Sequence, residues 1–183
     1  IVNNTAWTGG GGISLVRSNY GDSSIDVVIQ SCTIRHNETV GRGGGIHVVW
    51  PFSYDSPLRL VNCTIEDNAA YYGGGIHSYE RDIDVVRSRI CGNTASDGSG
   101  GGMYAPFSHC LLSSSIVSGN SCPFGYGGGV YAWSLACTNS TVVENSAPAG
   151  AGIHAYDASL TNCVFGLNRR PSRLDDFMIR GAL

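Results

Sequence analysis

The 183-residue sequence predicts an all-β solenoid of about six coils, each built from three short parallel strands. The first observation is a repeated unit, in which an Asn leads to a glycine cluster closed by one apolar residue, and then to a β-branched stretch. The second observation is that apolar residues alternate at period two, which favours strands over helices. The residues that close the glycine clusters are Ile13, Ile46, Ile76, Met103, Val130 and Ile153.

The strand before each Asn carries columns of residues that keep one chemical character from coil to coil. Such purity is expected of a parallel stack, because a slip of one residue would turn a whole strand inside out, and because each coil buries its inner face only against its neighbours. Two columns are apolar or small and should face inward: Ile29, Leu60, Val85, Leu112, Cys137, Leu160, and Cys32, Cys63, Ser88, Ser115, Ser140, Cys163. The polar column between them should face outward: Ser31, Asn62, Arg87, Ser114, Asn139, Asn162.

The Asn of each unit is expected to have a structural role at a corner of its coil. Its side-chain amide both accepts and donates hydrogen bonds, and stacked amides can bond along the solenoid. We expect the glycines to permit a tight corner and close approach between coils, not to hold a phosphate. The predicted ladder consists of Asn37, Asn68, Asn93, Asn120, Asn145 and Asn168.

Three segments resemble a known repeat: CTIRHNETVGRGGGIH (32–47), CTIEDNAAYYGGGIH (63–77) and SIVSGNSCPFGYGGGVY (115–131). They are similar to the GGAI and FxxN repeats of the polymorphic outer-membrane proteins, and more broadly to right-handed parallel β-helix passenger domains. The resemblance covers roughly residues 3 to 168, although the Phe of FxxN stands only at Phe165 and GGGI replaces GGAI. It implies a right-handed parallel β-helix, extracellular or on the cell surface, that serves adhesion or acts as a structural spacer.

Composition argues against several classes of protein. A formal net charge of −3 with 14% charged residues does not provide the basic surface that nucleic acid requires. No apolar run reaches the ~20 residues of a membrane span, and no motif indicates a cofactor. We interpret residues 1–168 as one solenoid domain. Because the chain begins inside a repeat, we expect it to be part of a longer protein.

Residues 169–183 break the repeat and are interpreted as a C-terminal cap or linker. Ser172 reads as a helix N-cap with Asp175 three residues later, and Leu174, Phe177 and Met178 fall on one side. The pattern predicts a short helix that ends at Gly181. Such a helix would cover strand edges at the end of the solenoid, or would link to another domain.

Aromatic side chains form the candidate binding surface. Three lie in a longer loop of the second coil, and three lie in the column three places past the glycine closers, which alternation places outward. Aromatic groups there could contact carbohydrate or a protein. The alternatives are that the loop aromatics fold back over the strand beneath and that the column rings stack to stiffen the sheet. The six residues are Trp50, Phe52, Tyr54, Tyr79, Trp133 and Tyr156.

A second column, one place past the glycine closers, is also expected to face outward. Within it, His47 and His77 could reach one metal ion, but no carboxylate or thiol in the column completes a site, so no metal is expected. The column reads Ser14, His47, His77, Tyr104, Tyr131, His154.

Seven cysteines without a CxxC pair do not indicate a zinc site or a redox motif. Candidate disulfides join neighbouring coils, and Cys163 is left over. Forward and backward counting disagree by two residues on whether Cys110 and Cys137 are level. The alternative is that reduced thiols fill space as small apolar groups. The candidate pairs are Cys32 with Cys63, Cys91 with Cys122, and Cys110 with Cys137.

Sequons of the form N-x-S/T indicate an extracellular glycoprotein, with chance occurrence as the alternative. The candidate glycosylation sites are Asn3, Asn62 and Asn139, of which the last two fall in the outward polar column. Asn37 also begins a sequon, but it belongs to the predicted ladder, so we expect it to carry no glycan.

Two functions from different classes remain. The favoured one is a non-catalytic extracellular module, adhesive or structural, that joins end to end or to other surface proteins, or contacts carbohydrate. The alternative is a polysaccharide lyase or hydrolase, which rests on fold analogy alone. Its candidate residues are Asp82 and Asp84 on one strand, Arg59 or Arg87 nearby, and Asp26. The neighbouring coils offer Arg59 and Ser134 instead of further acids, which favours the module over the enzyme.

Overall fold

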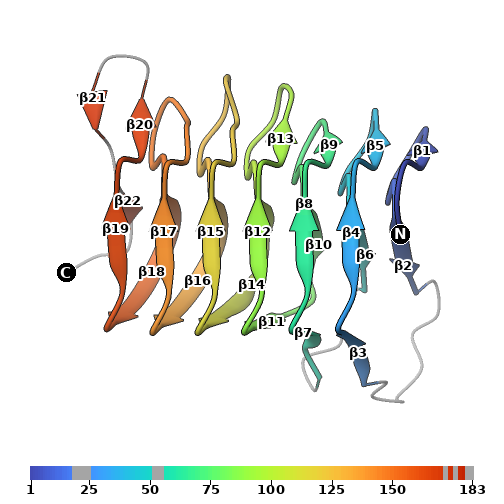
Figure 1. Ribbon diagram of the computed structural model, residues 1–183, viewed down its shortest axis with the longest axis horizontal. Helices are drawn as coiled ribbons and strands as arrows, with labels where there is room; N and C mark the ends of the chain where they lie inside the picture. The colour runs from blue at the N-terminus through green and yellow to red at the C-terminus, as the bar shows by residue number, and fades with distance from the viewer. Residues whose placement is uncertain (18–25, 51–55, 171–172, 175–176, 180–183) are drawn as a thin grey trace.

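The computed structural model describes residues 1–17, 26–50, 56–170, 173–174 and 177–179. These residues form an all-β solenoid whose coils stack in parallel along one axis, with the N-terminal and C-terminal coils at opposite ends (Figure 1). The predicted fold class is therefore confirmed. None of the described segments is a helix long and apolar enough to cross a membrane.

The strands before the ladder asparagines form a six-stranded parallel sheet. Each strand has three residues, and the central residue points into the core, where Ile34, Ile65, Ile90, Val117 and Val142 are fully buried. The strands are β4 (Thr33–Arg35), β8 (Thr64–Glu66), β12 (Arg89–Cys91), β15 (Ile116–Ser118), β17 (Thr141–Val143) and β19 (Val164–Gly166).

A ten-stranded sheet, here called the long sheet, forms the second face. In the first three coils it takes two strands per coil: β2 (Ile13–Val16) with β3 (Val27–Gln30), β6 (Ile46–Val49) with β7 (Leu58–Val61), and β10 (Ile76–Tyr79) with β11 (Ile83–Val86). From the fourth coil onward each pair merges into one strand: β14 (Met103–Ser113), β16 (Val130–Thr138) and β18 (Ile153–Thr161). Because β14 pairs with both β10 and β11, the merging strand holds the two halves together.

Two-residue strands after the ladder asparagines make a third, four-stranded sheet. They are β1 (Thr5–Ala6), β5 (Glu38–Thr39), β9 (Ala69–Ala70) and β13 (Thr94–Ala95). Isolated bridges continue the same line through Ser121, Ser146 and Arg169.

Left-handed backbone conformations mark three corners in each coil. The outward polar column is one of them, with φ between 47° and 53° at Ser31, Asn62, Arg87, Ser114, Asn139 and Asn162. Asn tolerates this conformation better than most residues, which explains its frequency in the column. A second corner precedes each ladder Asn, as at His36 and Asp67. The third needs glycine, as at Gly43, where an added Cβ would collide with the carbonyl of Ile46.

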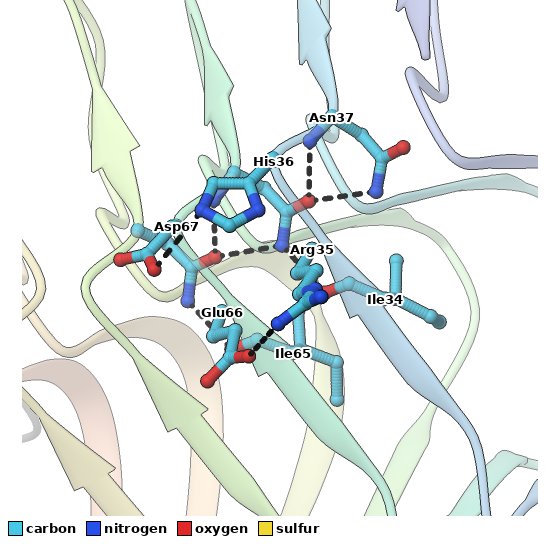
Figure 2. Close-up of polar contacts among 9 residues, drawn as sticks. Ile34, Arg35, His36, Asn37, Ile65, Glu66 and Asp67 are labelled. Carbon is cyan, nitrogen blue, oxygen red and sulfur yellow. Dashed lines mark hydrogen bonds and ion pairs between the residues drawn. The ribbon is translucent and has the colours of Figure 1, made fainter. Parts of the chain in front are cut away.

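The ladder asparagines bond from coil to coil along the buried corner. Each donates from its backbone N and its Nδ2 to the Oδ1 of the next, so that Asn37 bonds to Asn68 at 3.0 and 2.9 Å. The pattern repeats from Asn4 to Asn168. Figure 2 shows this arrangement at Asn37, with Arg35 and Glu66 forming an ion pair of 3.9 Å on the outer face.

The tail departs from the sequence prediction. Where a helix was expected, the described residues form strands: β20 (Arg169–Arg170) pairs with β21 (Arg173–Leu174) in an antiparallel hairpin, and β22 (Phe177–Ile179) pairs in parallel with β18. The outer edge of β18 offers unpaired backbone groups, and pairing with them satisfies more hydrogen bonds than an isolated short helix would. The tail therefore covers part of the solenoid end by extending the long sheet.

Candidate functional site

The column with His47, His77, Tyr104, Tyr131 and His154 forms a ladder of rings on the long sheet. Successive ring centroids lie 5.1, 5.5, 5.0 and 5.0 Å apart. The side chains leave the solenoid core, as alternation requires, but the turns before the glycines cover them. Tyr72 packs against Tyr104 at 5.0 Å and Tyr126 against His154 at 4.9 Å. The column therefore faces out of the core and stacks along the sheet, but His47, His77 and His154 are buried beneath these turns.

Burial sets the chemistry of the histidines in this ladder. His77 is 1% exposed, and burial, followed by the nearby His47, lowers its pKa to about 3. Burial, followed by the nearby Arg42, also lowers the pKa of His47. In the described part of the chain, no group of three or more His, Cys, Asp or Glu side chains is placed to hold a metal ion. The ladder thus acts as a second layer of packing on the sheet.

Trp50 does not belong to an exposed binding surface. It is 7% exposed and joins the hydrophobic core. The Arg81 guanidinium lies 4.3 Å from the centre of its ring, and that of Arg17 lies at 5.4 Å. Of the two alternatives given for Trp50, exposure to a ligand is wrong and packing against the protein is correct. Phe52 and Tyr54 lie outside the described residues.

An exposed aromatic row does exist in the outer column. It consists of Tyr79, Phe107, Trp133 and Tyr156, which come from β10, β14, β16 and β18. Trp133 and Tyr156 stack with centroids 4.6 Å apart, and Tyr79 meets Phe107 edge-on at 5.3 Å. Phe107, Trp133 and Tyr156 are 57%, 45% and 36% exposed. The row crosses four neighbouring strands and therefore runs along the solenoid axis.

Sequence reasoning missed Phe107, because a bulge in β14 displaces it. The register shifts between Ala105 and His109, which pair with Ala132 and Ser134, so β14 has two extra residues there. Three places past the closer Met103 stands Pro106, so the spacing that gives Tyr79, Trp133 and Tyr156 in the other coils passes over Phe107. The sequence carried one sign of these two extra residues: forward and backward counting disagree by two residues on whether Cys110 and Cys137 are level.

A groove lies beside the aromatic row. Its middle part has a volume of about 310 Å³ and is lined by Glu80, Asp82, Phe107, His109 and Trp133. It shares Phe107 with a hollow of about 180 Å³ that includes Tyr72, Tyr79 and Tyr104. On the other side it shares Asp82 and His109 with a hollow of about 250 Å³ that includes Asp84 and Ser134.

The groove is acidic on the side away from the tyrosines. The carboxylate of Asp82 accepts a hydrogen bond of 2.7 Å from the backbone N of His109, which fixes the bulge. Burial raises the pKa of the Asp84 carboxyl; Arg59, its neighbour in register, opposes the shift, and Asp82 adds to it. Glu80 adds a third carboxylate to the lining.

Only part of the set considered for a lyase lines the groove. Arg87 lies at a corner, where its Nε donates to Asn62 Oδ1 at 3.1 Å. Asp26 accepts a hydrogen bond from the Ser56 hydroxyl in an earlier coil. Of that set, Asp82 and Asp84 line the same hollow, and Arg59 faces Asp84 from the neighbouring strand.

All seven cysteines lie in the described residues and are free thiols. Cys110 aligns with Leu135 and Cys137 with Leu112, so the pairing of Cys110 with Cys137 was wrong. Cys91 aligns with Glu66 and Ser118, whereas Cys122 lies in a small core with Ala95, Ala147 and Ala151. In the column of Cys32 and Cys63, each thiol donates to a backbone carbonyl, of Gln30 and Ile29 respectively.

The sequon asparagines divide by exposure. Asn62 and Asn139 are exposed at the left-handed corner, and Asn3 is exposed near the N-terminus. Asn37 is buried with its amide bonded to Asn68, a position that a glycan could not occupy.

Comparisons with known proteins find no matching family model, no matching curated protein and no matching solved structure. The class of protein is therefore defined by the fold itself. The chain is a parallel β-solenoid with an exposed aromatic row and an acidic groove on its long sheet.

Proposed function

We propose that this chain is a non-catalytic, adhesive surface module that binds a carbohydrate chain along its aromatic row. The observation that carries the proposal is the row itself, with Phe107 and Trp133 exposed beside a groove. Exposed aromatic faces grouped on a protein mark contact sites for amphipathic ligands, and a row along the solenoid axis suits an extended chain. The resemblance to surface passenger repeats agrees with an extracellular or cell-surface location.

The charges beside the aromatic row favour one class of polysaccharide over another. Glu80, Asp82 and Asp84 would repel a polyuronide, which carries a carboxylate on each sugar. A neutral polysaccharide does not meet this repulsion. The polysaccharide-cleaving alternative has less support, because its candidate groups are engaged elsewhere: Arg87 donates to Asn62, Asp26 accepts from Ser56, and Asp82 accepts from the backbone N of His109.

The test is affinity electrophoresis of the chain in gels that contain either a soluble neutral β-glucan or polygalacturonate. We expect retardation by the β-glucan alone, and we expect Trp133→Ala to weaken it by about tenfold, since one stacking contact contributes roughly 1.4 kcal/mol. Trp7→Ala is the matched control, because Trp7 is 83% exposed but lies outside the row. Binding that survives Trp133→Ala, or migration unaffected by both polysaccharides, would overturn the proposal.

The end-to-end association considered above belongs to the same proposal. Among the residues that the structure describes, the strands β1, β2, β3 and β4 each stand at the end of their sheet order and have a neighbour on one side only. Such edges can pair with another chain. Electron microscopy of the purified protein should show linear assemblies if the edges are used in this way, and discrete particles if they are not.

A further inference from the structure

Two cysteines that the sequence did not pair lie in direct contact. The Sγ atoms of Cys137 and Cys163 are 3.3 Å apart. We propose that Cys137 and Cys163 are an oxidative modification site, which a small-molecule disulfide such as oxidised glutathione converts to a disulfide joining two successive coils. The proposal is independent of carbohydrate binding.

The fold brings these residues together across a corner. Cys137 lies in β16 and pairs with Leu160 of β18, and the chain then turns at Asn162, where φ is 52°. The turn directs the Cys163 thiol back to the previous coil, where it lies 3.2 Å from the carbonyl oxygen of Cys137. The thiol of Cys163 therefore reaches both the backbone and the side chain of Cys137.

Earlier coils show the same geometry with different residues. The hydroxyl of Ser115 donates to the carbonyl of Val85 at 3.1 Å, and that of Ser88 to the carbonyl of Leu60 at 3.4 Å. There the facing side chain is aliphatic, so the contact has no redox chemistry. At the equivalent pair of positions in the last coil both residues are cysteine, Cys163 and Cys137, so two thiols are in contact.

The two thiols differ in access, which sets the order of steps. Cys163 is half-buried, whereas Cys137 is fully buried. The Cys163 thiolate attacks one sulfur of oxidised glutathione, which forms a mixed disulfide and releases one glutathione thiolate. The Cys137 thiol then loses its proton and attacks the Cys163 sulfur, which forms the internal disulfide and releases the second glutathione. The chain loses two electrons and two protons, and one oxidised glutathione becomes two reduced molecules.

The second step should be slow. Burial, followed by the neighbouring Cys163, raises the pKa of the Cys137 thiol to about 12, and the attacking species is the thiolate. A mixed disulfide at Cys163 should therefore appear first and decay as the internal disulfide forms.

The experiment is a time course of the native chain with oxidised glutathione, quenched with acid and then alkylated. Cleavage after Glu144 separates the two cysteines, and tandem mass spectrometry assigns the joined residues. We expect a transient mixed disulfide at Cys163, followed by a joined peptide linking Cys137 to Cys163. Free, alkylated Cys137 and Cys163 at the end of the reaction would overturn the proposal, as would a mixed disulfide that persists at Cys163.

Two variants isolate the pair. In Cys163→Ser the joined peptide should be lost; this variant should fold, because serine occupies the same column at Ser88, Ser115 and Ser140. In Cys32→Ser, a matched change in the same column of an early coil, the joined peptide should form at the same rate as in the unchanged chain. Equal loss in both variants would also overturn the proposal.

Discussion

At the residue scale, the asparagine ladder is built from buried side-chain amides that hydrogen-bond from coil to coil. Asn93 donates to Asn120 Oδ1 and to the carbonyl of Ile65, and its own Oδ1 accepts two hydrogen bonds from Asn68. Buried polar groups are costly when they lack partners, so each ladder residue depends on the presence of the next. A ladder at one corner therefore favours one register of the coils.

The histidine and tyrosine ladder predicts a pH dependence of stability. His77 has an ordinary pKa of 6.5 and a folded-state pKa of about 3. Below pH 6.5 the unfolded chain binds a proton that the folded chain does not, so the free energy of unfolding falls as the pH drops from about 6.5 towards 3. The total loss from this group is on the order of 5 kcal/mol, taking about 1.4 kcal/mol per pKa unit.

Urea denaturation of the unchanged chain and of His77→Phe at several pH values between 7 and 4 tests this prediction. His77→Phe keeps a ring in the ladder but removes the titration, so its stability should depend less on pH. His109→Phe is the control, because His109 is exposed in the groove and takes no part in the ring ladder. Identical pH profiles for all three chains would contradict the assignment to His77.

At the element scale, the close approach of the coils at the glycine clusters limits what the sequence can contain. Gly101 is in the middle of such a cluster, and a Cβ there would lie 2.5 Å from the carbonyl oxygens of Gly128 and Ser121. Both atoms belong to the backbone of the next coil and cannot move aside. Gly166 lies in a strand of the six-stranded sheet, where a Cβ would meet nothing within 4 Å.

We therefore predict opposite outcomes for two alanine substitutions. Gly101→Ala should lower the free energy of unfolding by about 4 kcal/mol or more, because the coils must separate to admit the methyl group. Gly166→Ala should be neutral or stabilising by up to about 1 kcal/mol, because alanine restricts the unfolded chain. Thermal unfolding followed by circular dichroism measures both, and a similar fall in melting temperature for the two variants would contradict the close-approach argument.

The elements also show which features were predictable from sequence. The inward columns and the asparagine ladder depend on strict spacing before each Asn, and backward counting reproduces the register of Leu112 with Cys137. The position of Phe107 depends on a bulge, and the burial of Trp50 depends on Arg81 from another coil. Neither the bulge in β14 nor the packing of Arg81 on Trp50 can be predicted from the alternation of apolar and polar residues within one strand. The helix predicted in the tail failed because an available strand edge outweighed local helix signals.

At the scale of the whole molecule, the tail pairs with the last long strand of the described solenoid, and this pairing bears on association with other chains. β22 pairs with the first half of β18, joining Phe177 to Ile153 and Ile179 to Ala155. An uncovered edge would present backbone groups to other chains. The tail thus protects the C-terminal end of the long sheet, while β2 and β3 remain at the end of the sheet order on the N-terminal side.

Deletion of residues 171–183 should therefore promote association through β18. We expect the shortened chain to show a larger, concentration-dependent mass by size-exclusion chromatography with light scattering, because the edge from Ile153 to Ala155 becomes available for pairing. Deletion of residues 180–183 alone keeps β22 and is the matched control. Any association through the N-terminal edge will appear equally in the control, so the difference between the two deletions isolates the β18 edge. Equal masses at every concentration would show that β22 does not act as a cover, and the solenoid would then have to resist pairing at this end through its side chains.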